Sequence, residues 1–499
     1  MMNKGLSKLG LQLLDKLTDS FPTIVPQLFQ RAFLGTLGSS FVHGQIQASY
    51  ERKWCASSFR ASHFSPLSKP EKILLAVDVC IGDAILASEC LPVLRRAYPE
   101  AEIHYLCNKT GGELVEGMPG VIVHNFVRGE KGFPTREDLI GIRALVERES
   151  FSLVLNMGPF ITKRTLTRRG WEAAASTVLQ LYIPFAAFVL LAWKENGQRH
   201  ISYLAKIFLQ DFLGRFNEAH QPARSLENQL RILGQDSNSE AEPLNSNRVY
   251  LSDVSIDAAR RFLRSHNLQP GGGLLFFNPD ATSRFGMIPL EIQRRIIQDV
   301  TRMEGVSAVL IGQAYSNPLI EREIIASLDS ISRHKLVLVP HMPIGAYVAL
   351  LDACDMYISG DTGPIHIAAT RKLSPKDSAP MRNKTSVVAI YGATDSRMYG
   401  YDSEQPNHVP ANQDAPSRAF SAPVPCRNIT CINKFGKFCE EVRCFDRLPV
   451  EEVAAYIASY FSQLSKTRAL ESGSAIQTDL DAAVPNIEFS VDIERAFVS

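Results

Sequence analysis

The chain has almost no net charge. Its 499 residues include 53 Lys and Arg against 52 Asp and Glu, which gives a formal charge of +1 at pH 7. A balance this even provides no global electrostatic reason to bind nucleic acid, so no nucleic-acid partner is expected. No G-x-G-x-x-G motif follows the first expected strand of either half of the chain. This disfavours a dinucleotide-dependent dehydrogenase.

The chain also lacks a Sec-type start. Its first five residues, Met-Met-Asn-Lys-Gly, lead into an amphipathic run that polar residues interrupt. Together with nine cysteines, this favours a reducing, cytoplasmic setting, in which cysteines are thiols or metal ligands.

The length suggests two to four domains. Residues 1–70 are predicted to form a helical extension, because Leu6, Leu9, Leu13 and Leu17 recur at helical spacing. Such a helix either packs on the neighbouring domain or lies on a membrane surface. Residues 466–499, with Ser, Thr and scattered acids, are predicted to be a disordered tail.

Between these ends, residues 71–250 and 251–465 each alternate apolar runs with helical patterns. The apolar runs suit parallel strands buried on both faces, and they lie at 73–77, 104–107, 121–123, 153–155, 274–277, 308–312, 356–359 and 386–392. A helix is expected near 136–149, and another that starts at Leu448 and packs back across the first domain. The polar stretch from Arg371 to Lys384 is expected to be a surface loop. The predicted fold class is therefore α/β, with two Rossmann-like domains facing a central cleft. The loops that follow the strands, at 78–83, 279–284, 312–317, 359–364 and 391–399, should face this cleft.

An unusual segment lies at 173–193, where nearly all residues are apolar and Gln180 and Pro184 interrupt the run. Its length approaches the roughly 20 residues that span a bilayer. We expect an apolar helical insertion. It is either a helix that is buried or lies at a membrane interface, or a helix that spans the membrane.

Residues 359–369, Ser-Gly-Asp-Thr-Gly-Pro-Ile-His-Ile-Ala-Ala, end a strand, turn tightly and begin a helix. We call this segment the donor motif. Gly360 and Gly363 permit tight backbone geometry, and Pro364 suits the first helical position. The free amides at such a helix start favour an anion. A purely structural joint between strand and helix is the alternative.

Three other motifs accompany the donor motif in a fixed order. The first joins Ile73-Leu74-Leu75 to Gly82-Asp83 and to the stretch from Leu91 to Pro99; the others are Asn278-Pro279-Asp280-Ala281-Thr282-Ser283 and the stretch from Ile390 to Gly400. With these motifs the chain resembles glycosyltransferase family 9, the heptosyltransferase family of GT-B fold, over roughly 71–125 and 225–465. The resemblance implies an inverting enzyme that transfers a heptose-like sugar from a nucleotide diphosphate sugar, typically ADP-heptose.

The resemblance also implies roles for individual residues. Transfer needs a base for the acceptor hydroxyl and donors that stabilise the leaving diphosphate. Asp83 resembles the family's base, and the alternative is an N-cap of a helix that begins at Ala84. The residues that resemble the donor site are Thr282, Ser283, Arg284, Met342, Asp361, Thr362, Gly363 and His366. Either Glu321 or Glu323 could bind the ribose.

The chain departs from the family at one basic position. Many relatives have a basic residue and a Trp just before the proline that opens the helix after the Asn-Pro loop, whereas Gly286, Met287 and Ile288 precede Pro289 here. Arg284, two residues earlier, is the candidate substitute, but an Arg shifted along the loop need not reach the same oxygen. Donor identity therefore stays open, as does a non-catalytic nucleotide-sugar-binding protein of envelope assembly.

Four cysteines, Cys426, Cys431, Cys439 and Cys444, form a second cluster in the sequence. They suit a structural Zn or Fe site, although the four-residue gaps are wider than in compact zinc motifs; buried thiols or a disulfide are the alternatives. No cofactor is expected for catalysis. The predicted acceptor is a lipid-linked cell-envelope glycan such as lipopolysaccharide core, with another nucleotide sugar or a protein acceptor as alternatives. The expected location is cytoplasmic, peripheral to the inner face of the cytoplasmic membrane.

Overall fold

The fold was analysed in a computed structural model of the chain. The structure describes residues 70–77, 81–126, 135–156, 177–180, 248–281, 284–312, 323–373, 385–393, 396, 400–404, 416–422 and 443–481. The predicted extension at 1–70 lies outside the described residues except for its last residue, and so does most of the apolar segment at 173–193.

The first domain is built on a five-stranded sheet whose strand pairs are all parallel, with the order β3-β2-β1-β4-β5. The strands are β1 (Lys72–Ala76), β2 (Glu102–Asn108), β3 (Val121–Phe126), β4 (Leu153–Asn156) and β5 (Thr177–Gln180). Alternate residues of β1 enter different apolar clusters: Ile73 and Leu75 belong to one, Leu74 and Ala76 to another. Both faces of this strand are therefore buried, which explains its continuous apolar sequence.

Four helices accompany this sheet: α4 (Ile81–Ala87), α5 (Cys90–Ala97), α6 (Lys109–Val115) and α7 (Arg136–Glu149). The expected helix near 136–149 is confirmed. It begins where Thr135 and Asp138 form a reciprocal capping box, which satisfies two amides at the helix start.

The second domain is built on a six-stranded sheet with the order β13-β12-β10-β7-β8-β9, again with parallel pairs. Its strands are β7 (Leu274–Asn278), β8 (Ala308–Gly312), β9 (Leu336–Val339), β10 (Met356–Gly360), β12 (Ser386–Tyr391) and β13 (Arg418–Ser421). Numbered from its first strand, this sheet has the doubly wound order 3-2-1-4-5-6. The predicted α/β class with two Rossmann-like domains, the GT-B architecture, is confirmed.

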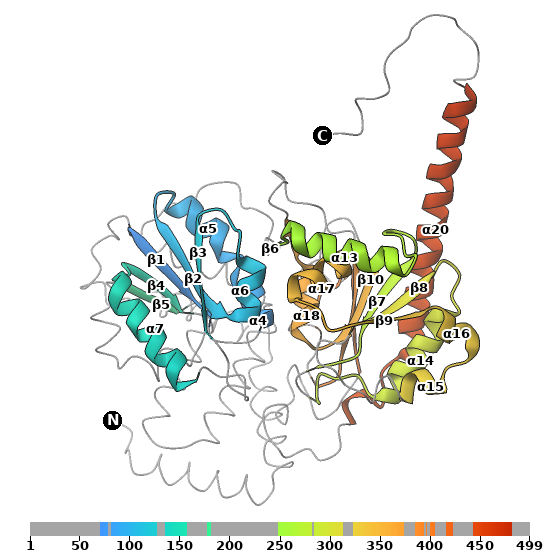
Figure 1. The fold of residues 1–499 in the computed structure, drawn as a ribbon. Coiled ribbons are helices and arrows are strands. Elements are labelled where there is room, and N and C mark those ends of the chain that lie inside the picture. The colour runs from blue at the N-terminus through green and yellow to red at the C-terminus, as the bar shows by residue number, and fades with distance from the viewer. Residues whose placement is uncertain are drawn as a thin grey trace, which may run out of the picture.

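The remaining helices of the described residues belong to the second domain. They are α13 (Asp253–Ser265), α14 (Leu290–Thr301), α15 (Ile325–Ser327), α16 (Ser330–His334), α17 (Ile344–Asp352), α18 (Gly363–Ala369), the short 3-10 helix η5 (Arg443–Phe445) and α20 (Val450–Asp481). Figure 1 shows the two domains side by side, with α4 and α6 on the side of the first domain that faces α17 and α18 of the second.

The two domains share an apolar cluster. Ile85 on α4 and Leu114 on α6 belong to the same buried cluster as Tyr347 on α17 and Ile365 on α18. Burial of such surface is the main favourable term in association, so the described arrangement brings the domains into direct contact.

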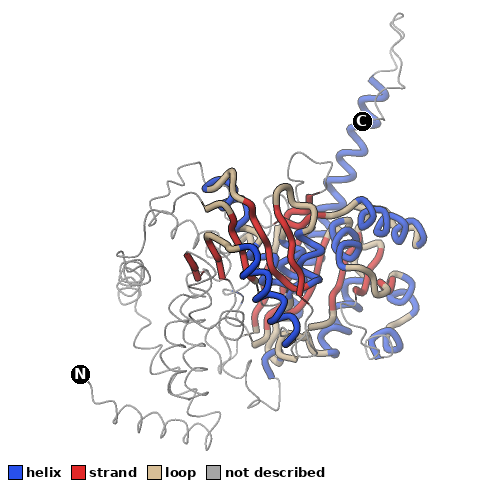
Figure 2. The backbone as a smooth tube through the Cα atoms, turned by 60° about the vertical axis from the view of Figure 1, so that its left-hand side comes forward, coloured by secondary structure: helices blue, strands red, loops and turns tan. Residues whose placement is uncertain are grey.

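The C-terminal helix differs from the prediction in two ways. We expected a helix that packs across the first domain and ends before a disordered tail at 466. Instead α20 continues to Asp481, and Val453, Ile457 and Phe461 pack in the second-domain core (Figures 1 and 2). Arg468 adds an ion pair with Asp355 of the same domain at 2.6 Å. The disordered-tail prediction is thus wrong for 466–481, and residues 482–499 lie outside the described part.

Two further segments differ from expectation. Thr177–Gln180, inside the predicted apolar helix, forms β5 beside β4, so the helical prediction is wrong there. Its β-branched residues Thr177 and Val178 favour a strand. Arg371–Leu373, expected within a surface loop, forms β11, which pairs with β6 (Arg248–Tyr250).

Among the helices of the described residues, none is long and apolar enough to cross a membrane.

Candidate active site

The two helix starts that follow β1 and β10 meet at the boundary between the domains. A Cβ atom placed on Gly82 of α4 would lie 2.8 Å from Cδ2 of His366 and 3.1 Å from Cα of Gly363. A Cβ atom placed on Gly363 would lie 2.7 Å from Cγ2 of Ile81. Real Cβ atoms essentially never lie within 3.0 Å of such atoms, so the first turns of α4 and α18 pack against each other too closely for a side chain at either glycine. The turn that carries Asp83 and the donor motif are therefore neighbours in space.

Asp83 is the third residue of α4 and is partly exposed. The helix begins before it, at Ile81, so the alternative in which Asp83 is the N-cap of a helix starting at Ala84 is wrong. An acid in the first turn still gains from the positive end of the helix dipole. The turn is anchored from β2, because the Tyr105 hydroxyl donates to the Ala84 carbonyl at 2.5 Å. Burial raises the pKa of Tyr105 well above its usual value, with the Asp83 charge a smaller cause, so this anchor stays protonated.

Polar side chains link the ends of the two central strands of the second sheet. Asn278, the last residue of β7, donates from Nδ2 to Oγ of Ser359 at 2.9 Å. The Ser359 hydroxyl in turn lies 3.2 Å from the Thr362 hydroxyl, just before α18. The side chain of the N-cap residue Thr362 does not cap α18, whose second residue, Pro364, has no amide hydrogen. The first amides of α18 are thus not bonded by the N-cap side chain.

The predicted donor residues of this motif differ in exposure. Asp361, Thr362 and Gly363 are partly exposed, whereas His366 is only 8% exposed. Nδ1 of His366 lies 2.8 Å from the hydroxyl of Tyr401, a residue that the sequence analysis did not single out. Burial first, and the Glu89 carboxylate second, raise the pKa of Tyr401 well above its usual value.

The loop after β7 packs under the donor motif. The Asp361 amide donates to the Gly286 carbonyl at 3.1 Å, and a Cβ atom at Gly286 or at Gly360 would overlap the facing main chain. Buried Gln293 holds the same loop, since its Nε2 donates to the carbonyls of Pro279 at 2.9 Å and Ile288 at 2.6 Å.

Two side chains of this loop bear on its chemistry. Arg284 is exposed, with its guanidinium carbon 4.9 Å from the centre of the Phe285 ring. Asp280 is 8% exposed. Burial raises the pKa of Asp280, although the Ala281 amide donates to its Oδ1 at 2.8 Å. The predicted donor residues Thr282 and Ser283 lie outside the described residues.

The candidate residues for the nucleoside are less clearly grouped. Met342 is half-buried before α17 and packs against the apolar cluster shared by the domains. Glu323 is exposed just before α15, and Glu321 lies outside the described residues.

The predicted cysteine site is not assembled within the described part of the chain. Cys444 is buried in the second-domain core beside Phe445 and Leu448. Cys426, Cys431 and Cys439 lie outside the described residues.

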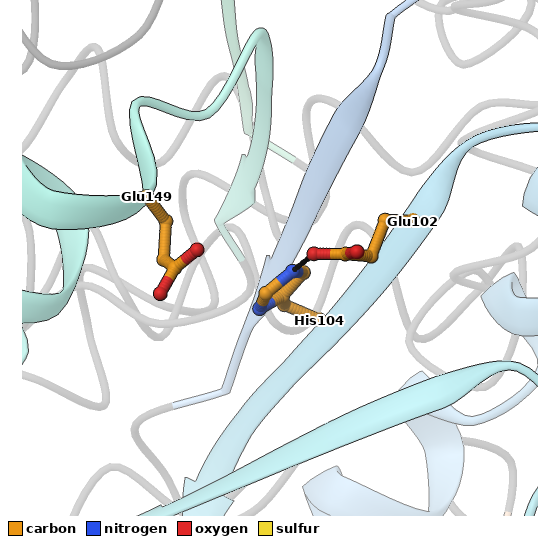
Figure 3. Close-up of side chains that lie close together, drawn as sticks. All are labelled: Glu102, His104 and Glu149. Carbon is orange, nitrogen blue, oxygen red and sulfur yellow. Dashed lines mark hydrogen bonds and ion pairs between the residues drawn. The ribbon is translucent and has the colours of Figure 1, made fainter.

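A group with metal-ligand chemistry does occur among the described residues, in the first domain (Figure 3). Nε2 of His104 lies 2.6 Å from Oε1 of Glu102, and Glu149 lies nearby. Lys72 forms ion pairs with both carboxylates of this group, since its ammonium lies 2.8 Å from Glu149 and 3.7 Å from Glu102. The Lys72 hydrogen bond lowers the pKa of Glu149 to about 2. Lys72 and Glu102 are the first residues of β1 and β2, so this ion-pair network lies at the opposite strand ends from Asp83.

Comparisons with known proteins agree with the motifs. Residues 251–428 match the model of glycosyltransferase family 9 (heptosyltransferase). No curated protein matches the chain. Similar solved structures include a glycosyltransferase family 9 protein from Veillonella parvula, with 16% identity, coverage of 70% of this chain and 86% of that chain, and a TM-score of 0.47.

Two structures from E. coli are similar at the same level. ADP-heptose LPS heptosyltransferase II has 12% identity, covers 79% of this chain and 99% of its own, and has a TM-score of 0.45. The structure of heptosyltransferase WaaC with ADP has 14% identity, and the match covers 78% of this chain and 99% of that chain, with a TM-score of 0.45. The family match at 251–428 covers the donor motif and the loop after β7.

Proposed function

Because residues 251–428 match the model of glycosyltransferase family 9, we propose that the chain is a glycosyltransferase. It transfers a heptose-like sugar from a nucleotide diphosphate sugar such as ADP-heptose to a cell-envelope glycan such as lipopolysaccharide core. The observation that carries the proposal is the contact between the first turns of α4 and α18. This contact brings a partly exposed acid, Asp83, beside the start of α18 in the donor motif.

The proposed reaction is a single inverting displacement. Asp83 accepts the proton of the acceptor hydroxyl while that oxygen bonds to the anomeric carbon from the face opposite the leaving group. The bond between the anomeric carbon and the diphosphate oxygen breaks, and its electron pair leaves with the nucleoside diphosphate. Main-chain amides at the start of α18 stabilise the charge that develops on the diphosphate.

The remaining donor contacts are proposed from the family motifs. Asp361 binds sugar hydroxyls, while Thr362, Gly363, Thr282, Ser283 and Arg284 face the diphosphate, and Met342 borders the nucleobase. The acceptor is proposed to be lipid-linked and reached from the cytoplasmic face of the membrane, with the enzyme bound peripherally. No cofactor is proposed for the transfer, and a structural Zn or Fe at the four cysteines remains a separate proposal.

One observation favours a second candidate, a nucleotide-sugar-binding protein without transferase activity. The position where many relatives carry a basic residue is occupied by Gly286, and the facing Asp361 carbonyl leaves no space for a side chain there. A site without this cation would hold a diphosphate less tightly and stabilise its leaving charge less.

The first test is a thermal-shift panel of nucleotide sugars on the full chain. The proposal expects ADP-heptose, or another nucleotide sugar, to raise the melting temperature in a concentration-dependent way, because a ligand that binds only the folded state stabilises it. Release of nucleoside diphosphate on adding an acceptor separates an enzyme from a binding protein. Absence of any shift across the panel would count against both candidates.

A further inference from the structure

His366 lies too deep in the domain boundary to be explained by donor binding alone. It is the fourth residue of α18 and 8% exposed, and its ring edge faces the first domain. A Cβ atom at Gly82 would meet its Cδ2 at 2.8 Å and its Nε2 at 3.6 Å. The ring therefore occupies the space where any other residue at 82 would place its side chain, one residue before Asp83.

The orientation of this ring is fixed from the other side. Nδ1 of His366 lies 2.8 Å from the Tyr401 hydroxyl, and the two rings meet edge to face with centroids 5.8 Å apart. Tyr401 is 1% exposed, so a hydrogen bond lost there leaves a buried polar group unsatisfied. The buried carboxylate of Glu89, two residues after α4, acts electrostatically on Tyr401. Groups from both domains thus surround the His366 ring.

We propose that His366 is a positioning residue, which holds the Gly82–Asp83 turn of the first domain against the donor motif of the second while Tyr401 fixes its ring. This inference rests on the proposed function, in which Asp83 is the base. In a two-domain transferase the base and the donor lie on different domains, so the distance between them depends on how the domains meet. A displacement of about 1 Å at a reacting centre can lower the rate about 100-fold.

Gly82→Ala isolates the contact. Gly82 lies in α4 and its φ is not in the left-handed region, so alanine is locally favourable there. Its methyl group would meet the His366 ring most closely, at 2.8 Å from Cδ2, and the Gly363 Cα next, at 3.1 Å. The matched control is Gly141→Ala in α7, where a Cβ atom meets nothing within 4 Å. We expect Gly82→Ala to lower kcat about 10- to 100-fold with the donor Kd within twofold of wild type, and Gly141→Ala to change neither.

A double-mutant cycle tests the partner. If the alanine at 82 acts by pushing the His366 ring, then Gly82→Ala combined with His366→Ala should be no slower than the slower single variant. Tyr401→Phe should lower kcat with an unchanged donor Kd, whereas Tyr456→Phe, on α20 of the same domain, should not. Multiplicative effects of Gly82→Ala and His366→Ala would overturn the proposal, as would wild-type kcat in Gly82→Ala. A donor Kd that rises in His366→Ala as much as kcat falls would make His366 a donor ligand instead.

A measurement without substrate separates this inference from the proposed function. Small-angle X-ray scattering of the full chain should give a larger radius of gyration for Gly82→Ala than for wild type and Gly141→Ala, because the domains separate. Thermal unfolding of each variant checks that it is folded. If wild type binds no nucleotide sugar, the proposed function fails while scattering still tests the domain contact; an unchanged radius of gyration in folded Gly82→Ala would overturn the contact.

Discussion

The main chains of Asp361 and Gly286 are joined by a hydrogen bond of 3.1 Å, which fixes the loop after β7 beneath the donor motif. The packing is tight on both sides, since a Cβ atom at Gly286 would overlap the Asp361 carbonyl and one at Gly360 would overlap the Gly286 carbonyl. The packing of these two main chains therefore excludes a basic side chain at position 286.

The first prediction concerns this loop. Gly286→Ala should raise the donor Kd about tenfold or more, because the new methyl group displaces Asp361 and the start of α18 from the diphosphate. Calorimetric titration with ADP-heptose measures the change, with Gly141→Ala as the control. Unchanged or tighter binding would contradict the packing argument.

The second prediction concerns Asp280. A buried carboxylate beside a bound diphosphate repels it, so Asp280→Asn should lower the donor Kd severalfold at neutral pH. The same change should stabilise the free protein. Because the folded-state pKa is raised, the Asp280 charge destabilises the fold increasingly as pH rises through that pKa, and it has no effect below the usual value of 3.8.

Donor titrations and urea unfolding of Asp280→Asn at acid and neutral pH check both parts. A gain in stability that is equal at both pH values would mean that the charge is not its cause.

The third prediction concerns the docking of α20. Asp355, 8% exposed, accepts from the amides of Gly273 and Leu274 through Oδ2, both at 2.8 Å, and pairs with Arg468 through Oδ1. Its carbonyl also accepts from the Tyr460 hydroxyl at 3.0 Å.

Asp355→Ala leaves two buried amides without an acceptor and should cost about 2–4 kcal/mol of unfolding free energy. Arg468→Ala should cost about 1 kcal/mol or less, because its side chain is partly exposed. Urea unfolding measures both. Equal losses in the two variants would show that the ion pair, and not the amide contacts, dominates.

The fourth prediction is a pH dependence. The Lys72 hydrogen bond, followed by that from Arg148, lowers the pKa of Glu149 to about 2 from the usual 4.5. A depressed folded-state pKa contributes stability that is fully present above pH 4.5 and is lost as pH falls from 4.5 towards 2. Glu149→Gln should therefore flatten the loss of stability in that window, relative to wild type.

Urea midpoints measured from pH 2 to pH 6 check this prediction. Glu147→Gln, an exposed acid of the same helix, is the control. A wild-type slope in Glu149→Gln between pH 4.5 and 2 would contradict the assignment.

Local sequence patterns predicted the sheets well. Runs such as 73–77 and 274–277 are apolar throughout because both faces of a central parallel strand are buried, and the structure has strands there. The helix at Arg136–Glu149 was also predicted from its sequence pattern. The prediction of a helix at Thr177–Gln180 is wrong, because a short strand inside a long apolar segment has the composition of a buried helix.

Contacts between distant segments could not be predicted from the sequence. Tyr401 meets His366 across 35 residues, and Glu89 acts on it from the other domain. No spacing rule connects such residues, although Tyr401 directly follows a family-like motif that ends at Gly400. The docking of α20 on the second domain likewise depends on tertiary packing, which its amphipathic sequence does not specify.

Sugar transfer by Asp83→Asn is the most direct test of the proposed role of Asp83 as the base. Transfer from labelled ADP-heptose to a lipopolysaccharide-core acceptor is measured beside donor binding by calorimetry, with Glu291→Gln, an exposed acid in the first turn of α14, as the control. We expect kcat to fall about 100- to 10,000-fold in Asp83→Asn, while the donor Kd stays within about twofold and the control is unchanged. Wild-type transfer by Asp83→Asn would contradict the role of Asp83 as the base and, with it, the proposed active site.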